Sequence, residues 1–139
     1  YKGQYFSCKY GLAQMVKQDV GGVVILIASI TALSGMSPNV SYSSSKAGVV
    51  NLARHIAVHY GPKGIRANSI SPGPLERTPD FDNHPDPVGR KKDYLDKMPV
   101  GRLGTAEDIA PFITFLSTDD ASYASGANFV IDGGWTIIS

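Results

Sequence analysis

Tyr42 and Lys46 are the two residues whose types and spacing point most directly to chemistry. The three residues between them place both side chains on one helix face, one turn apart. An ammonium beside a phenol favours the phenolate and lowers the pKa of the tyrosine from about 10 toward the range of a general acid/base. Ser29 follows an apolar stretch and could hydrogen-bond the substrate oxygen that exchanges this proton. The three residues therefore predict proton transfer in carbonyl/alcohol redox chemistry.

The composition sets limits on the class of protein. The chain has 139 residues, of which 42% are hydrophobic and 18% are charged, and its net charge is +1. This composition is ordinary for a soluble globular domain and has no basic bias that would predict a nucleic-acid partner. The longest apolar run, Val23 to Ala28, is too short to span a bilayer. Cys8 is the only cysteine, so we expect no intrachain disulfide and a cytoplasmic location.

The pattern of apolar residues predicts helices that alternate with strands. A continuous β-branched run is typical of a strand buried on both faces, so the alternation predicts an α/β fold with a parallel sheet. Ser29 and Pro72–Gly73 each follow a predicted strand, which puts both at the rim where ligands bind in such sheets. The predicted helices are 1–18, 40–60 and a capped helix from Thr105 to Ser117, and the predicted strands are 23–28, 65–70 and 128–131.

The stretch from Leu75 to about Arg90 is rich in proline and poor in apolar residues. A loop of this length in a compact domain is usually functional, so we interpret about 74–100 as a lid or substrate loop. We expect a short helix near 91–98 to close it. Within the later helix, Pro111 predicts a kink.

Several residues have simpler interpretations. A Tyr-x-x-x-Lys match alone could be an ordinary exposed helix face, and only its combination with the two strand ends favours a site. His55 and His59 have a spacing that suits a metal, but the sequence offers no third ligand, so we expect no metal site. Asp132 is expected to form a turn. Arg66 and Asn68 are expected to fix the turn after the second strand.

These motifs taken together resemble the short-chain dehydrogenase/reductase family along the whole chain. The resemblance is to the C-terminal catalytic half of a member of roughly 250 residues. It rests on the apolar strand that ends in Ser29, on Tyr42-Ser-Ser-Ser-Lys46 and on Ile65-Arg-Ala-Asn-Ser-Ile-Ser-Pro-Gly73. It continues through 101–110 and 115–117 to Val130-Ile-Asp-Gly-Gly134.

The resemblance implies a partial Rossmann-like, doubly wound parallel sheet that lacks the first βαβ units. It also implies that Tyr42 is the catalytic acid/base, that Lys46 lowers its pKa and binds the nicotinamide ribose, and that Ser29 orients the substrate carbonyl. The segment from Pro72 through Gly73 to Leu75 is similar to the family's nicotinamide-contacting loop. Thr78 is a candidate for the same role, although it lies one residue later than the usual threonine.

Two departures from the family pattern matter. The family's catalytic asparagine would fall immediately before Tyr1, and the glycine-rich turn that binds the pyrophosphate has no counterpart in the chain. The cofactor is therefore expected to be NAD or NADP, with no basis for choosing between them. We interpret the chain as the C-terminal catalytic portion, 1–139, of one dinucleotide-binding domain.

The predicted function is hydride transfer between NAD(P)(H) and an alcohol or carbonyl substrate, with Tyr42 as proton donor and acceptor. Polar residues in the lid favour a sugar or polyol, and Ser29, Thr31, Met36 and Tyr94 are the candidate substrate contacts. By resemblance, we expect homodimers or homotetramers. The alternatives are a catalytically silent fragment or oligomerisation module with an open sheet edge, and a family member whose reaction is not net redox. The isolated chain is expected to be inactive.

Overall fold

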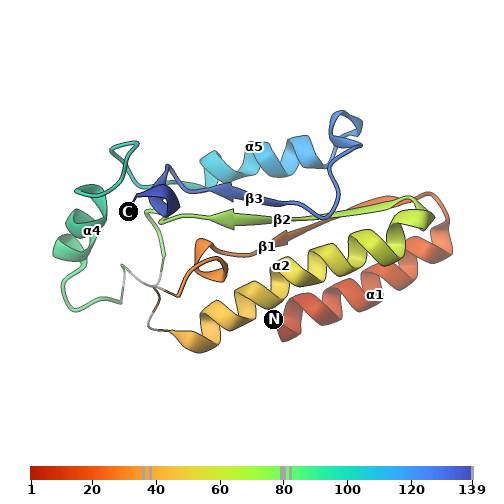
Figure 1. Ribbon diagram of the computed structural model, residues 1–139, viewed down its shortest axis with the longest axis horizontal. Helices are drawn as coiled ribbons and strands as arrows, with labels where there is room; N and C mark the ends of the chain where they lie inside the picture. The colour runs from red at the N-terminus through yellow and green to blue at the C-terminus, as the bar shows by residue number, and fades with distance from the viewer. Residues whose placement is uncertain (36, 38, 79–80, 82, 139) are drawn as a thin grey trace.

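A three-stranded parallel sheet forms the centre of the protein (Figure 1). The computed structural model describes residues 1–35, 37, 39–78, 81 and 83–138. The strands are β1 (Gly22–Ile27), β2 (Ile65–Pro72) and β3 (Asn128–Ile131), and they lie in the order β1-β2-β3. The predicted α/β class and parallel sheet are thus confirmed, and the second strand runs two residues further than predicted.

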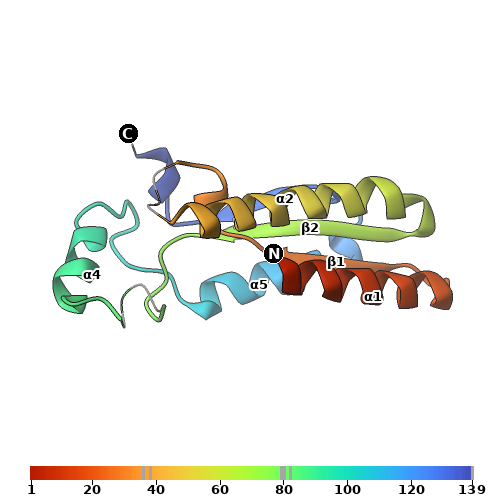
Figure 2. The same cartoon turned by 90° about the horizontal axis from the view of Figure 1, so that it is seen from below.

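Helices cover both faces of this sheet. Helix α1 (Lys2–Gln18) and helix α2 (Val40–Tyr60) pack on one face, where their buried side chains meet Leu26 and Ala28. Helix α5 (Ala106–Leu116) packs on the other face, against Ile70. Figure 2 shows α2 and α5 on opposite sides of the strands. No described helix combines the length and apolar content needed to cross a bilayer.

Helix α2, which carries the predicted acid/base pair, begins and ends as the sequence predicts. The side chain of Asn39 accepts a hydrogen bond from the backbone N–H of Tyr42 at 3.0 Å and so caps the first turn. Its inward face is fully apolar and includes Val49, Ala53 and Ile56. The cap and the buried face together fix the orientation of the first turn at the end of the sheet.

One expectation about burial is wrong. β1 was expected to be buried throughout, but Val23, Val24 and Ile25 are only half-buried and Ile27 is exposed. The reason is that β1 lies at one edge of the described sheet.

The predicted helix at 91–98 is displaced in the structure. Helix α4 spans Pro87–Leu95 and lies beyond the carboxyl end of the sheet (Figure 1). Asp86 caps it by accepting a hydrogen bond from the N–H of Gly89 at 2.9 Å, and Pro87 occupies its first turn. An Asp-Pro pair is a helix start signal, so the true boundary was readable from the sequence.

The predicted start of α5 is confirmed. The Asp108 carboxylate accepts a hydrogen bond from the Thr105 N–H at 2.8 Å, which completes a capping box. Asp132 is also a turn former as predicted, because its carboxylate accepts from the N–H groups of Gly134 and Thr136. Arg66 and Asn68 bond to backbone atoms in the segment 116–127 and so tie that segment to β2.

Candidate active site

Ser29 lies two residues after the end of β1 and is largely buried. Its Oγ accepts two hydrogen bonds from Thr31, one from the backbone N–H at 3.2 Å and one from the hydroxyl at 3.1 Å. A hydroxyl has two acceptor lone pairs and one proton. Because Thr31 occupies both lone pairs, the remaining capacity of Ser29 is to donate. A hydroxyl that can donate at this position suits a carbonyl or alcoholate oxygen.

Tyr42 and Lys46 meet as the helical spacing predicts. The Lys46 Nζ lies 5.6 Å from the centre of the Tyr42 ring. Tyr42 is 43% exposed, so its ring is open to a ligand. The cation thus lies beside the Tyr42 ring.

Lys46 also reaches the end of β1. Its Nζ donates a hydrogen bond to the carbonyl oxygen of Ile27 at 2.9 Å, two residues before Ser29. Partial burial lowers the pKa of Lys46 below its usual 10.5, because desolvation disfavours the ammonium. Lys46 therefore links the second turn of α2 to the strand end that leads into Ser29.

The second strand end contributes backbone rather than side chains. Gly73 donates its N–H to the carbonyl of Ile131 at 2.9 Å. A Cβ on Gly73 would lie 2.6 Å from the Cα of Asp132, so no larger residue fits without moving the turn. Pro72 and Gly73 thus lie at the same carboxyl rim of the sheet as Ser29.

Leu75 and Thr78, the other two candidate cofactor contacts, both contact other parts of the protein. Leu75 forms an isolated bridge with Gly104 and packs into the cluster under α5. The carbonyl of Thr78 accepts a hydrogen bond from the N–H of Phe81 at 3.0 Å. These contacts place Leu75 in the apolar packing and Thr78 in backbone contact with Phe81.

The structure places Tyr94, a predicted substrate contact, within an aromatic cluster. Its ring stacks on Trp135 with a centroid distance of 4.8 Å and meets Phe81 edge-on at 5.3 Å. The Arg90 guanidinium lies over the same ring and donates to its hydroxyl at 3.2 Å. Tyr94 thus joins helix α4 to the C-terminal segment that contains Trp135. The candidate Met36 lies outside the described residues.

Two residues near the site were missed from the sequence. Gln4 donates from its Nε2 to the carbonyl of Ile27 at 3.1 Å, so it shares this acceptor with Lys46. Its position one turn before the buried Cys8 was the available signal, because it predicts an inward-facing amide. Trp135 was missed because no motif contains it, although it is the only tryptophan.

The rings of the two histidines in helix α2 contact each other. The rings of His55 and His59 are 4.2 Å apart, centre to centre, and both residues are exposed. Within the described parts of the chain, no three His, Cys, Asp or Glu side chains gather into a possible metal site.

Comparison with known proteins gives a consistent result. A family model described as enoyl-(acyl carrier protein) reductase matches residues 1–136. The chain is 39% identical over 133 residues to L-rhamnose 1-dehydrogenase (NAD(P)(+)) of Sphingomonas sp., which covers 95% of this chain and 52% of that protein. It is 33% identical over 140 residues to dehydrogenase/reductase SDR family member 6 of Xenopus laevis, with 98% and 57% covered.

A solved structure extends the match to three dimensions. The crystal structure of a candidate 2-deoxy-D-gluconate 3-dehydrogenase from Agrobacterium tumefaciens with bound NADP superposes with a TM-score of 0.87 at 33% identity. The superposition covers 96% of this chain and 54% of that one. The chain therefore spans about half the length of these relatives. On the strength of the family model, the relatives and the shared fold, this chain belongs to the short-chain dehydrogenase/reductase family.

Proposed function

We propose that this chain supplies the proton-transfer half of an NAD(P)-dependent oxidoreductase that interconverts an alcohol and a carbonyl. The observation that carries the proposal is the position of Lys46. Its ammonium lies beside the Tyr42 ring and bonds to the strand end that leads into Ser29. A cation, a phenol and an oriented hydroxyl donor are the groups that such a reaction requires at the substrate oxygen.

Ser29 and Tyr42 have different roles at the substrate oxygen. Ser29 holds the oxygen through its one free proton, because its lone pairs are occupied by Thr31. Tyr42 takes the proton from the alcohol during oxidation and returns it during reduction. Oxidation needs the phenolate and so gains rate as the pH rises, whereas reduction needs the phenol.

Lys46 acts on Tyr42 through its charge. Its ammonium favours the phenolate, and the effect is strengthened by the partial burial that also lowers the pKa of Lys46 itself. We assign no proton transfer to Lys46. Its side chain is also placed to donate to hydroxyl groups of a bound ribose.

The described residues fit the nicotinamide end of a dinucleotide. Tyr42 and Lys46 would hold the ribose, and the Pro72–Gly73 backbone at the end of β2 would face the carboxamide. When bound, the cofactor supplies the hydride that leaves or enters the substrate carbon. The choice between NAD and NADP stays open. Leu75 and Thr78 remain weaker candidates because their contacts are with the protein.

We further propose that the chain is the C-terminal catalytic portion of one dinucleotide-binding domain, and that it is inactive alone. Its relatives are about twice as long, and its sequence has no glycine-rich strand–turn–helix for a pyrophosphate. A polyol or sugar is the proposed substrate class, supported by the relative that acts on L-rhamnose. Assembly into homodimers or homotetramers remains a prediction of the resemblance.

The proposal is tested with the full-length protein and a panel of sugars, polyols and simple secondary alcohols. Formation of NADH or NADPH is followed by absorbance with each oxidised cofactor. We expect turnover of at least one hydroxylated substrate and none by the isolated 139 residues, which should also bind NADH weakly. Tight NADH binding by the isolated chain would contradict the partial-domain assignment, and failure of every substrate class would contradict the oxidoreductase assignment.

A further inference from the structure

The last two turns of α2 carry two histidines, His55 and His59, on one side of the helix. Their ring centres are 4.2 Å apart, and both side chains are exposed. Among the described residues, none is hydrogen-bonded to either ring, whereas the Nδ1 atom of His84 accepts from the backbone N–H of Asp86. The ring nitrogens of His55 and His59, the histidine pair, are therefore available to a ligand.

A hollow with a volume of about 480 Å³ lies beside the histidine pair, between α1 and α2. Ala13 and Val16 line it from α1, and Tyr60 and Lys63 line it from the end of α2 and the turn that follows. A ligand on the pair therefore has room for bound water molecules of its own.

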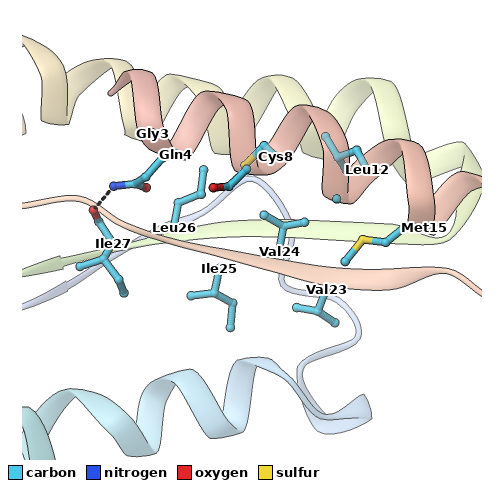
Figure 3. A pocket seen from close by; sticks show the side chains of 12 residues that line it. Gly3, Gln4, Cys8, Leu12, Met15, Val23, Val24, Ile25, Leu26 and Ile27 are labelled. Atoms are coloured by element: carbon cyan, nitrogen blue, oxygen red, sulfur yellow. Dashed lines mark hydrogen bonds between the residues drawn. The ribbon is translucent and has the colours of Figure 1, made fainter.

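Both helices that border the hollow are held in place by their buried faces. Figure 3 shows Cys8, Leu12 and Met15 of α1 facing β1. On α2, Ala53 and Ile56 are buried in the same apolar cluster as Cys8 and Leu12. Because this packing fixes the backbone next to the histidine pair, a ligand that binds both rings finds them already close together, and such preorganisation favours binding.

The position of the pair on the helix favours a cation. The last turn of a helix carries partial negative charge from its unpaired carbonyl groups, and α2 ends at Tyr60, one residue after His59. Lys63 also lines the hollow and opposes a cation. It is exposed, so solvent and salt screen its charge.

We propose that the histidine pair binds one late first-row transition-metal cation, of the class of Zn²⁺, Ni²⁺ and Cu²⁺, with water in its remaining positions. Imidazole is a preferred ligand of these cations, whereas Mg²⁺ and Ca²⁺ take oxygen ligands. The sequence predicted no metal site because it offers no third protein ligand, and none joins the pair among the described residues. Metal sites with open positions hold water there, so two imidazoles and bound water form a sufficient ligand set.

Binding of the cation stabilises the end of α2. The two rings lie at this distance only while the helix is formed, so the free energy of metal binding adds to the stability of the folded state. His55 lies nine residues after Lys46, a rise of about 14 Å along the helix. The site is therefore separate from the proposed catalytic groups and does not depend on their chemistry.

Hydrogen exchange in the full-length protein, without an affinity tag, tests the site. The amides of the last two turns of α2 are followed by mass spectrometry with ZnCl₂, with MgCl₂ and with neither. We expect Zn²⁺ to slow their exchange by a factor of about 100 when it is present at about 100 times its dissociation constant, and Mg²⁺ to have no effect. The dissociation constant comes from the zinc dependence of the same exchange rates.

Two variants and a control locate the effect. His55→Gln and His59→Gln should each remove the protection by Zn²⁺. His84→Gln, at an exposed histidine whose ring is already bonded, should retain it.

The proposal is overturned if millimolar Zn²⁺ gives no protection, if MgCl₂ protects equally, or if protection survives in either variant of the pair. Its loss in His84→Gln would overturn the proposal too. The readout is local, so metal sites elsewhere in the full-length protein do not imitate it. It needs neither substrate nor cofactor, so its failure is distinct from a failure of the proposed oxidoreductase activity.

Discussion

Thr31 donates two hydrogen bonds to the Oγ of Ser29, at 3.2 Å from its backbone N–H and at 3.1 Å from its hydroxyl. The arrangement leaves Ser29 with a proton to give and no lone pair to offer. It therefore distinguishes a serine that orients a substrate oxygen from one that acts as a base. Thr31 was a candidate substrate contact, and its geometry also makes it a positioning residue for Ser29.

Replacing Thr31 with Val should lower kcat of the full-length protein about tenfold, as expected for the loss of one hydrogen bond that orients a reacting group. Thr31→Ser keeps the hydroxyl and should restore most of the rate. Steady-state kinetics with both variants provide the measurement. Equal rates for Thr31→Val and the unmodified protein would show that the second hydrogen bond has no role.

The rate of alcohol oxidation should fall at high pH. The fall follows loss of the Lys46 ammonium and should lie below pH 10.5, because burial lowers the pKa of that residue. Arginine keeps its charge in this range, so Lys46→Arg should abolish the fall even if the maximal rate drops. Lys63→Arg is the control and should leave the fall in place.

Asp108 should stabilise the fold in a pH-dependent way. Arg102 donates to both of its carboxylate oxygens at 2.7 Å, and this pairing, together with the Thr105 N–H, holds the pKa of Asp108 well below its usual 3.8. The stabilisation is complete above pH 3.8 and is lost as the pH falls through the depressed pKa.

Asp108→Asn should therefore have a lower urea midpoint than the unmodified protein at pH 7, and the difference should narrow as the pH falls below about 4. Asp120→Asn, at an exposed aspartate, is the control. A difference that stays constant down to strongly acidic pH would contradict the ion-pair account.

Trp135 should anchor the lid through its stacking on Tyr94. Trp135→Ala removes this contact and should lower the free energy of unfolding by about 2 kcal/mol. Trp135→Phe should retain more than half of that stability, and Ile137→Ala, at an exposed neighbour, should change little. Urea titration supplies the values. If Trp135→Ala is no less stable than Ile137→Ala, the aromatic cluster does not hold the lid.

The elements with strong local signals were predictable from the sequence. Helix α2 was predicted with its true bounds because its apolar period is regular and Gly61 follows it. The pairing of Tyr42 with Lys46 followed from the same helical geometry. The capping box at Thr105 and the turn at Asp132 depend on side chains close in sequence, so they too were readable.

Features set by contacts between distant segments were not predictable. The half-buried state of β1 depends on which strands flank it, which its own residues do not encode. The link from Lys46 to Ile27 joins a helix to a strand end, and only the packing of α2 on β1 creates it. The stacking of Tyr94, a candidate substrate contact, on Trp135 was not predictable, because the two residues lie far apart in the sequence.

The central claim is that Tyr42 exchanges the proton with the substrate oxygen, and Tyr42→Phe in the full-length protein tests it most directly. The measurement is kcat for alcohol oxidation together with the dissociation constant of NADH or NADPH from fluorescence, with Tyr123→Phe, at a fully exposed tyrosine, as the control. We predict that kcat falls by about a thousandfold or more, while cofactor affinity falls by no more than about tenfold, as expected for the loss of one ribose contact, and the control is unchanged. Turnover by Tyr42→Phe within about tenfold of the unmodified rate would contradict the assignment.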